Sequence, residues 1–173
     1  MKLILATILL SHSLWGYVYD TLLVDTHATL APKLLMMSSV SKDIEHLSIC
    51  IVCENTDDGV ALRFKQTLHH KYKNIKTVSS HYVKMQSECS RSHMLFLFDA
   101  PDEIIAKSVK YAKLNHKLTM SYSSRYLDLG VLLSLHIGRS VKPYLNLSPS
   151  KEYGISFSNS LKRVSKLWKG GWI

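Results

Sequence analysis

Three cysteines, Cys50, Cys53 and Cys89, are the residues whose type and spacing come nearest to a chemical motif. Cys50 and Cys53 have the spacing of many redox and metal sites, but they lie in the apolar run 47–53, which predicts a buried strand. A catalytic dithiol normally begins a helix, where the helix dipole lowers the thiol pKa. Side chains three apart on a strand point to opposite faces, so these two sulfurs should neither chelate one metal nor bond to each other. In an oxidising compartment we expect a disulfide from Cys50 or Cys53 to Cys89, with one thiol left over.

Metal, nucleophilic and phosphate chemistry have no local signature in the chain. The nine histidines include no His-x-x-x-His or His-Glu-x-x-His pattern, so we predict no metal site. There is no Gly-x-Ser-x-Gly elbow and no glycine-rich phosphate loop. We therefore predict no catalytic residue and no cofactor site, and expect that the protein is not an enzyme.

Asp99 is the carboxylate best placed for a function, because it directly follows the apolar run 93–98. Open α/β sheets bind their ligands outside the carboxyl ends of the strands. An ordinary loop that begins a helix explains the same position, so we assign Asp99 no catalytic role. We interpret Phe98, Tyr122 and Tyr126 as packing residues and not as a ligand cage.

The elements that would position these residues alternate between strand and helix. The predicted strands are 47–53, 74–83, 93–98 and 118–122, and the predicted helices are 17–39, 59–72 and 101–114. Pro32 lies inside the first helix and is expected to kink or divide it. The alternation predicts an α/β fold: a single three-layer domain whose mostly parallel sheet is flanked by helices.

The last third of the chain is expected to add a hairpin and a helix. Segments 131–137 and 141–147, on either side of a short glycine turn, predict a β-hairpin near the C-terminus. A final amphipathic helix is predicted from apolar residues at spacings of four, three and four, namely Phe157, Leu161, Val164 and Trp168.

The first sixteen residues combine a lysine, a short apolar run and small residues at Ser11, Ser13 and Gly16. This order is typical of a secretory signal peptide, and the run is shorter than the roughly 20 residues that a membrane-spanning helix needs. We predict a signal peptide at 1–16, a mature domain at 17–173, and a periplasmic location. The alternatives are an uncleaved anchor or a buried N-terminal strand.

The formal net charge is +9, which attracts anionic partners. Export argues against nucleic acid and leaves an anionic membrane surface or an acidic protein face as the partner. Basic residues gather near the C-terminus, where we predict that Arg163 and Lys166 bind the partner. A solvated helix face explains these charges equally well, and a homodimer is left open.

Several segments together resemble the YfiR-like family of periplasmic regulators. The similar segments are 47–52, 93–98, 118–122, 130–135, 141–146 and 154–161, within residues 47–168. The chain departs from the family in lacking its aromatic-Trp-Pro segment and in having Val131 where the family has a second glycine. The resemblance implies a non-enzymatic periplasmic protein that binds the sensory part of an inner-membrane diguanylate cyclase and holds its activity down.

Three functions follow as hypotheses. The leading one is a periplasmic regulatory or sensory binding protein that docks on an inner-membrane signalling receptor. The alternative is a periplasmic solute-binding module with a concave pocket near Glu54-Asn55 and Asp99-Ala100, outside the carboxyl ends of the strands. The third is an exported hydrolase, which would need a cleft that joins a nucleophile, a base and an oxyanion-binding group.

Overall fold

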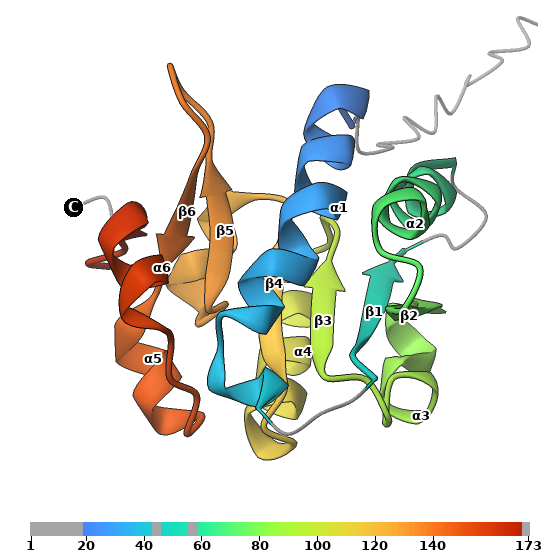
Figure 1. The fold of residues 1–173 in the computed structure, drawn as a ribbon. Helices are drawn as coiled ribbons and strands as arrows, with labels where there is room; N and C mark the ends of the chain where they lie inside the picture. The colour runs from blue at the N-terminus through green and yellow to red at the C-terminus, as the bar shows by residue number, and fades with distance from the viewer. Residues whose placement is uncertain (1–18, 43–45, 55–58, 171–173) are drawn as a thin grey trace, which may run out of the picture.

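The computed structural model describes residues 19–42, 46–54 and 59–170. The predicted signal peptide and the turn with Asn55 lie outside these residues. The sheet has the order β2-β1-β3-β4-β5-β6-β7 (Figure 1). Its parallel strands are β1 (Ser48–Cys53), β2 (Lys76–His81), β3 (Met94–Leu97), β4 (Leu118–Ser121) and β5 (Leu133–His136).

Two further strands complete the sheet beyond β5. Strand β6 (Lys142–Leu145) is antiparallel to β5, which confirms the predicted hairpin. The short strand β7 (Lys166–Leu167) then pairs parallel with β6. The α/β class and the mostly parallel sheet are therefore as predicted.

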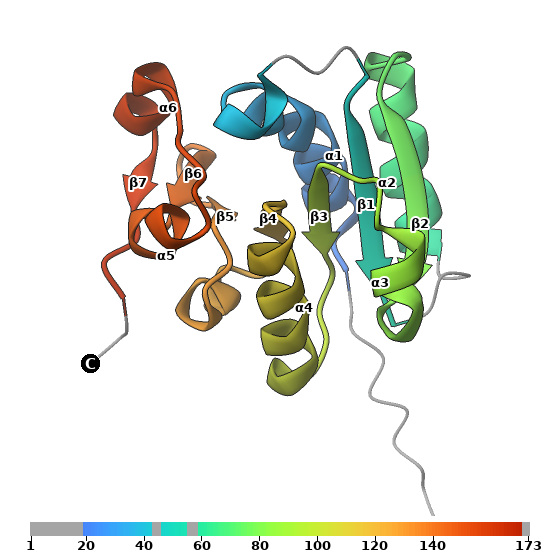
Figure 2. The same cartoon turned by 90° about the horizontal axis from the view of Figure 1, so that it is seen from below.

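Helices cover both faces of the sheet, as Figures 1 and 2 show for α1 and α4. The helices are α1 (Thr21–Met36), α2 (Gly59–Lys71), α3 (Met85–Glu88), α4 (Asp102–Leu114), α5 (Leu147–Glu152) and α6 (Asn159–Val164), with 3-10 turns η1 (Ser39–Ser41), η2 (Tyr82–Lys84) and η3 (Ser124–Leu129). Helices α1 and α2 share one face, where Arg63 pairs with Asp25. Helices α3 and α4 share the other, where the Tyr111 hydroxyl donates to the Gln86 carbonyl.

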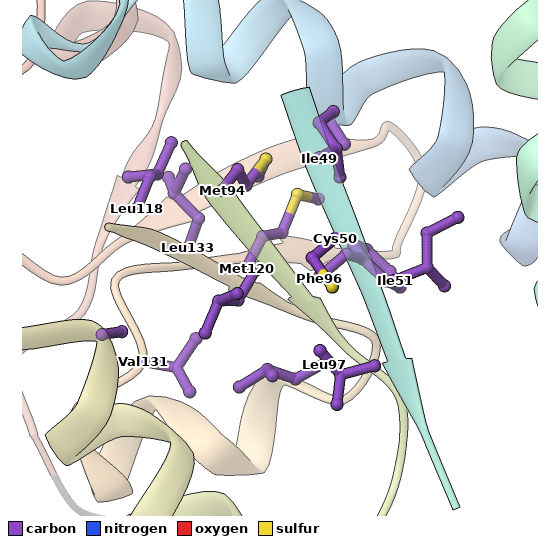
Figure 3. Packing of buried hydrophobic residues seen from close by; sticks show 14 of the residues in the cluster. Ile49, Cys50, Ile51, Met94, Phe96, Leu97, Leu118, Met120, Val131 and Leu133 are labelled. Atoms are coloured by element: carbon purple, nitrogen blue, oxygen red, sulfur yellow. The ribbon is translucent and has the colours of Figure 1, made fainter. Parts of the chain in front are cut away.

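The core lies on both faces of the central strands. Every residue of β1, β3 and β4 is buried (Figure 3). The mostly apolar sequences of β1 and β3 are typical of strands that are covered on both faces, whereas β4 also buries Thr119 and Ser121. Helix α1 continues through Pro32, so the expected division at this residue does not occur.

Cys50 and Cys89 form a disulfide, with Cα atoms 5.6 Å apart. The bridge ties β1 to the residue that ends α3, and it confirms the predicted pairing of Cys89 with one of the two strand cysteines. Cys53 is buried and takes no part in the bridge. Odd separation along a strand puts it on the opposite face from Cys50.

The C-terminal segment differs from its prediction. Helix α6 covers only Asn159–Val164, and the chain then becomes extended at Ser165 before β7. Leu161 is fully buried, but Val164 is 57% exposed, so the expected apolar face does not form. The physical reason is pairing: Trp168 donates its backbone N–H to Leu145 of β6, a hydrogen bond that a continued helix would not make.

Candidate functional site

The strand order reverses between β1 and β3, because the chain passes from β1 to α2 on one face and from β3 to α4 on the other. In open α/β sheets, ligands bind outside the carboxyl ends of the strands at such a switch point. The carboxyl ends of β1 and β3 point toward the start of α1 (Figure 1). Glu54 follows β1 there, and Asp99 stands two residues after β3.

Tyrosine hydroxyls from distant parts of the chain meet the backbone at this end of the sheet. The Asp99 amide donates to the Tyr19 hydroxyl at 3.1 Å across 80 residues. The Asp20 amide donates to the Tyr122 hydroxyl, also at 3.1 Å, across 102 residues. These bonds join the start of α1 to the loops after β3 and β4. We call Tyr19, Asp99, Tyr122 and Tyr126 the tyrosine site.

Tyr126 forms hydrogen bonds to Ala100, the residue that follows Asp99. Its hydroxyl donates to the Ala100 carbonyl at 2.7 Å, and it accepts from the Ala100 amide at 3.0 Å. The Arg125 guanidinium donates to the same hydroxyl at 2.7 Å and lies 3.6 Å from an oxygen of Asp102. The loop that carries Asp99 is thus fixed from both sides.

Two buried polar atoms border this site without a hydrogen-bond partner among the described residues: Oδ1 of Asp99 and Nε2 of His27. His27 is 1% exposed, and its Nδ1 lies 2.7 Å from the Leu23 carbonyl. A carbonyl only accepts, so Nδ1 is the donor in this contact, and the Tyr122 carbonyl also acts on the ring. An unsatisfied buried group costs about 1–3 kcal/mol, so two of them around one site need an explanation.

Aromatic rings connect the two unpartnered atoms. The His27 ring lies 5.0 Å from the Tyr122 ring, which lies 5.9 Å from Phe98. Tyr19 packs edge-on against both Phe98 and Tyr122, with ring centroids 5.1 Å apart in each pair. The buried imidazole and the carboxylate therefore belong to one cluster.

Burial also shifts the ionisation of both groups. It lowers the pKa of His27 to about 4, so the imidazole is neutral near pH 7. Burial raises the pKa of Asp99, and the nearby Tyr126 hydroxyl and Arg125 guanidinium partly offset this effect. Shifted carboxyl and imidazole groups in one place are a known mark of functional sites.

An open groove of about 510 Å³ lies beside the tyrosine site, between the first turns of α1 and α2. Tyr19 forms part of its wall and so links it to the loop of Asp99. Arg63, also in the wall, donates to both carboxylate oxygens of Asp25, at 2.9 and 2.6 Å. A pocket was expected near Glu54-Asn55 and Asp99-Ala100. Asn55 is not described, and the described lining of the groove includes none of Glu54, Asp99 and Ala100, so a pocket at that place stays a prediction.

The other residues selected from the sequence lie away from this site. Arg163 is exposed on α6, whereas Lys166 lies on β7 with its Nζ 2.7 Å from Nε2 of His136. The assumption that both stand on one helix face is therefore wrong, and their binding to a partner stays a prediction. Phe98 and Tyr126 are fully buried, as expected of packing residues.

Ser48 and His93 form the pair that most resembles a hydrolase dyad, with Ser48 Oγ 3.0 Å from His93 Nδ1. The Ser48 backbone amide donates to this same Nδ1, and the Ser48 hydroxyl donates to the Arg91 carbonyl. The Ser48 hydroxyl thus has two possible acceptors at 3.0 Å, and His93 Nδ1 already accepts from the Ser48 amide.

Among the residues that the structure describes, no three His, Cys, Asp or Glu side chains gather where they could hold a metal ion. Within those residues, too, no helix combines the length and the apolar character needed to cross a membrane.

Sequence reasoning missed Tyr19 and His27 as parts of the site. Both lie on or next to α1, and their positions carry no motif. A weaker signal than a motif was available for the position of the site. Asp99 and Tyr122 lie at the ends of two predicted strands, and parallel strands bring their carboxyl ends to the same side of a sheet.

No family model and no curated protein matches the chain. Solved structures do resemble it. A conserved domain protein from Vibrio cholerae is 14% identical, with a TM-score of 0.62 over 83% of this chain and 59% of that one. A ligand-free, open substrate binding protein with adhesive properties from Clostridium difficile is 12% identical, with a TM-score of 0.62 over 86% and 60%.

A third structure is an ABC domain in complex with L-Trp from Streptococcus pneumonia. It is 11% identical, with a TM-score of 0.58 over 83% of this chain and 59% of that one. The chain thus spans about three-fifths of the length of these proteins. At such identities the likeness concerns the fold alone, an α/β domain with a mostly parallel sheet.

Proposed function

We propose that this protein is an exported solute-binding module that holds a small organic ligand at the tyrosine site. The observation that carries the proposal is the pair of unpartnered buried atoms, Asp99 Oδ1 and His27 Nε2, around one aromatic cluster at the switch point. Ligand sites are concave and largely apolar, with a few polar groups that fix orientation. The tyrosine site supplies aromatic surface and a few polar groups, and the groove beside Tyr19, lined by both polar and apolar residues, supplies the concave part.

Two further observations support the proposal. The similar solved structures include one described as a substrate binding protein and one in complex with L-Trp. The Cys50–Cys89 disulfide suits an oxidising compartment outside the cytosol. The proposal is one of binding without chemical conversion.

The regulatory role on an inner-membrane receptor stays a prediction of the family resemblance. It needs a protein surface with different affinities for two receptor states, whereas solute binding needs an enclosed polar contact. The two functions make different demands on the tyrosine site, and this difference can be measured.

The test is amide NMR on the full-length, isotope-labelled chain, titrated with pools of amino acids, amines, carboxylic acids and sugars. The amides of Asp20, Asp99 and Ala100 report on the site directly, because each donates to a tyrosine hydroxyl. The Ser48 amide, which donates to His93 at the opposite end of β1, is the control.

We expect at least one pool to shift the three site amides with saturation while the Ser48 amide stays unchanged. If no pool does so, solute binding at this site is refuted. Saturable shifts confined to the region around Ser48 would also refute it, because they would place the ligand at the amino ends of the strands.

A further inference from the structure

We infer that the ligand of the tyrosine site is an organic cation with a primary ammonium group beside an apolar or aromatic portion, and that Asp99 binds the ammonium. This inference rests on the proposed function and adds the chemical class of the solute. The basic groups Arg125 and Arg63 already have acidic partners, whereas the buried Oδ1 of Asp99 has no hydrogen-bond partner among the described residues.

The positive groups near the site are already paired. Arg125 donates to the Tyr126 hydroxyl at 2.7 Å and lies 3.6 Å from an Asp102 oxygen. Arg63, in the groove, makes two hydrogen bonds to the carboxylate of Asp25. An anionic ligand would have to displace these partners before it could use either guanidinium.

The positive ends of helices α1 and α4 are compensated as well. The Asp20 side chain accepts from the Leu23 amide at 3.0 Å and so caps α1. The first turn of α4 contains Asp102 and Glu103. Acidic groups at a helix start offset the dipole that would otherwise attract an anion.

Asp99 differs from these acids because its Oδ1 is buried and has no partner among the described residues. A donor from a ligand would satisfy this oxygen, and a charged donor would do so most strongly. Aromatic residues lie near Asp99: the Tyr19 hydroxyl accepts from its amide, and the Tyr19 ring packs against Phe98 and Tyr122. Aromatic faces attract cations within about 6 Å, by roughly 0.5–2 kcal/mol.

An organic cation fits this arrangement better than a metal ion does. Calcium takes six to eight oxygen ligands, and no group of three acidic, histidine or cysteine side chains gathers within the described ranges. One carboxylate with aromatic walls matches an ammonium group attached to an apolar body. The groove beside Tyr19 gives that body a place to lie.

The test compares three probes of similar size on the full-length chain: 2-phenylethylamine, 2-phenylethanol and 3-phenylpropionate. Affinities come from calorimetry at pH 7.5, and the Asp99 and Ala100 amide shifts locate the binding. We expect the amine to bind at least tenfold more tightly than the alcohol, and the carboxylate to bind most weakly. This comparison uses the unaltered protein and does not depend on the folding of a variant.

Variants then assign the preference to one residue. Asp99→Asn should reduce amine affinity to that of the alcohol and leave alcohol binding within about twofold. Glu88→Gln removes the same charge from an exposed position on α3 and should change neither affinity. An amine preference that survives Asp99→Asn would overturn the assignment of the ammonium to Asp99.

The two proposals fail in different ways. If the alcohol or the carboxylate shifts the Asp99 and Ala100 amides as strongly as the amine does, the ammonium inference is wrong while solute binding stands. If all three probes and all solute pools leave these amides unchanged, both proposals are wrong.

Discussion

The hydroxyl of Tyr126 bridges both backbone polar groups of Ala100: it donates to the carbonyl at 2.7 Å and accepts from the amide at 3.0 Å. Ala100 is fully buried, so neither group can turn to water instead. The bridge fixes the residue directly after Asp99 and therefore the position of that carboxylate. One side chain on η3 thus determines the geometry of a loop that begins 26 residues earlier.

Tyr126→Phe should lower the free energy of unfolding by about 1–3 kcal/mol, because it leaves the buried Ala100 amide and carbonyl without this partner. Tyr111→Phe is a matched control, since its hydroxyl makes one exposed bond to Gln86, and it should change stability by less than about 0.5 kcal/mol. Urea unfolding measures both. Equal effects would mean that the Tyr126 bridge does not stabilise the fold.

The buried imidazole of His27 should make stability depend on pH. Burial lowers its folded-state pKa from 6.5 to about 4, so between these values the unfolded chain binds more protons. Stability is then complete above about pH 6.5 and falls as the pH decreases toward 4, by at most about 3 kcal/mol.

Denaturant unfolding of His27→Gln at pH 7.5, 6 and 5 tests this dependence. The variant should lose the part of the pH slope that the imidazole contributes, whereas His70→Gln, at an exposed position of α2, should keep it. A variant with the same slope as the unaltered chain would show that His27 is not neutral in the fold.

The Cys50–Cys89 disulfide should leave a single thiol. Alkylation of the unfolded, non-reduced protein should add one label, at Cys53, and reduction beforehand should raise the count to three. Replacing Cys50 and Cys89 together by alanine should cost about 3–4 kcal/mol, because the bridge closes a loop of 39 residues. Three labels without reduction, found by mass spectrometry of periplasmic material, would exclude the bridge.

Alanine substitutions at Leu161 and Val164 distinguish the observed C-terminal structure from a continuous amphipathic helix. Leu161→Ala should cost about 2–5 kcal/mol, since this side chain is fully buried. Val164→Ala should change stability by less than about 0.5 kcal/mol, because the side chain is largely exposed. Thermal or urea unfolding gives both values, and comparable losses would favour a helix that continues past Val164.

The sequence by itself determined the central sheet. Strands β1 and β3 are short, mostly apolar runs, and such runs are stable only when both of their faces are covered. The alternation with amphipathic helices then requires parallel strands, since a crossover helix returns the chain to the same end of the sheet. Side chains alternate between the two faces of a strand, so the sequence also predicted that Cys50 and Cys53 lie on opposite faces and do not pair with each other.

The tertiary structure decided the end of the chain. The spacing of Phe157, Leu161 and Val164 is helical, yet Lys166–Leu167 pairs with β6. Sequence periodicity reports which side chains could share a face, but it carries no information about an unpaired strand elsewhere. The hydrogen bonds that β6 offers outweigh a local helical preference, which is a weak term for each residue.

The tyrosine site, too, exists only in the folded chain. Tyr19 and Asp99 are 80 residues apart, and neither stands in a motif that refers to the other. The strand order places the carboxyl end of β3 beside the start of α1, and this arrangement depends on the packing of α1 against the sheet. Packing of that kind is set by shape and burial across the whole molecule, which no local pattern of residues records.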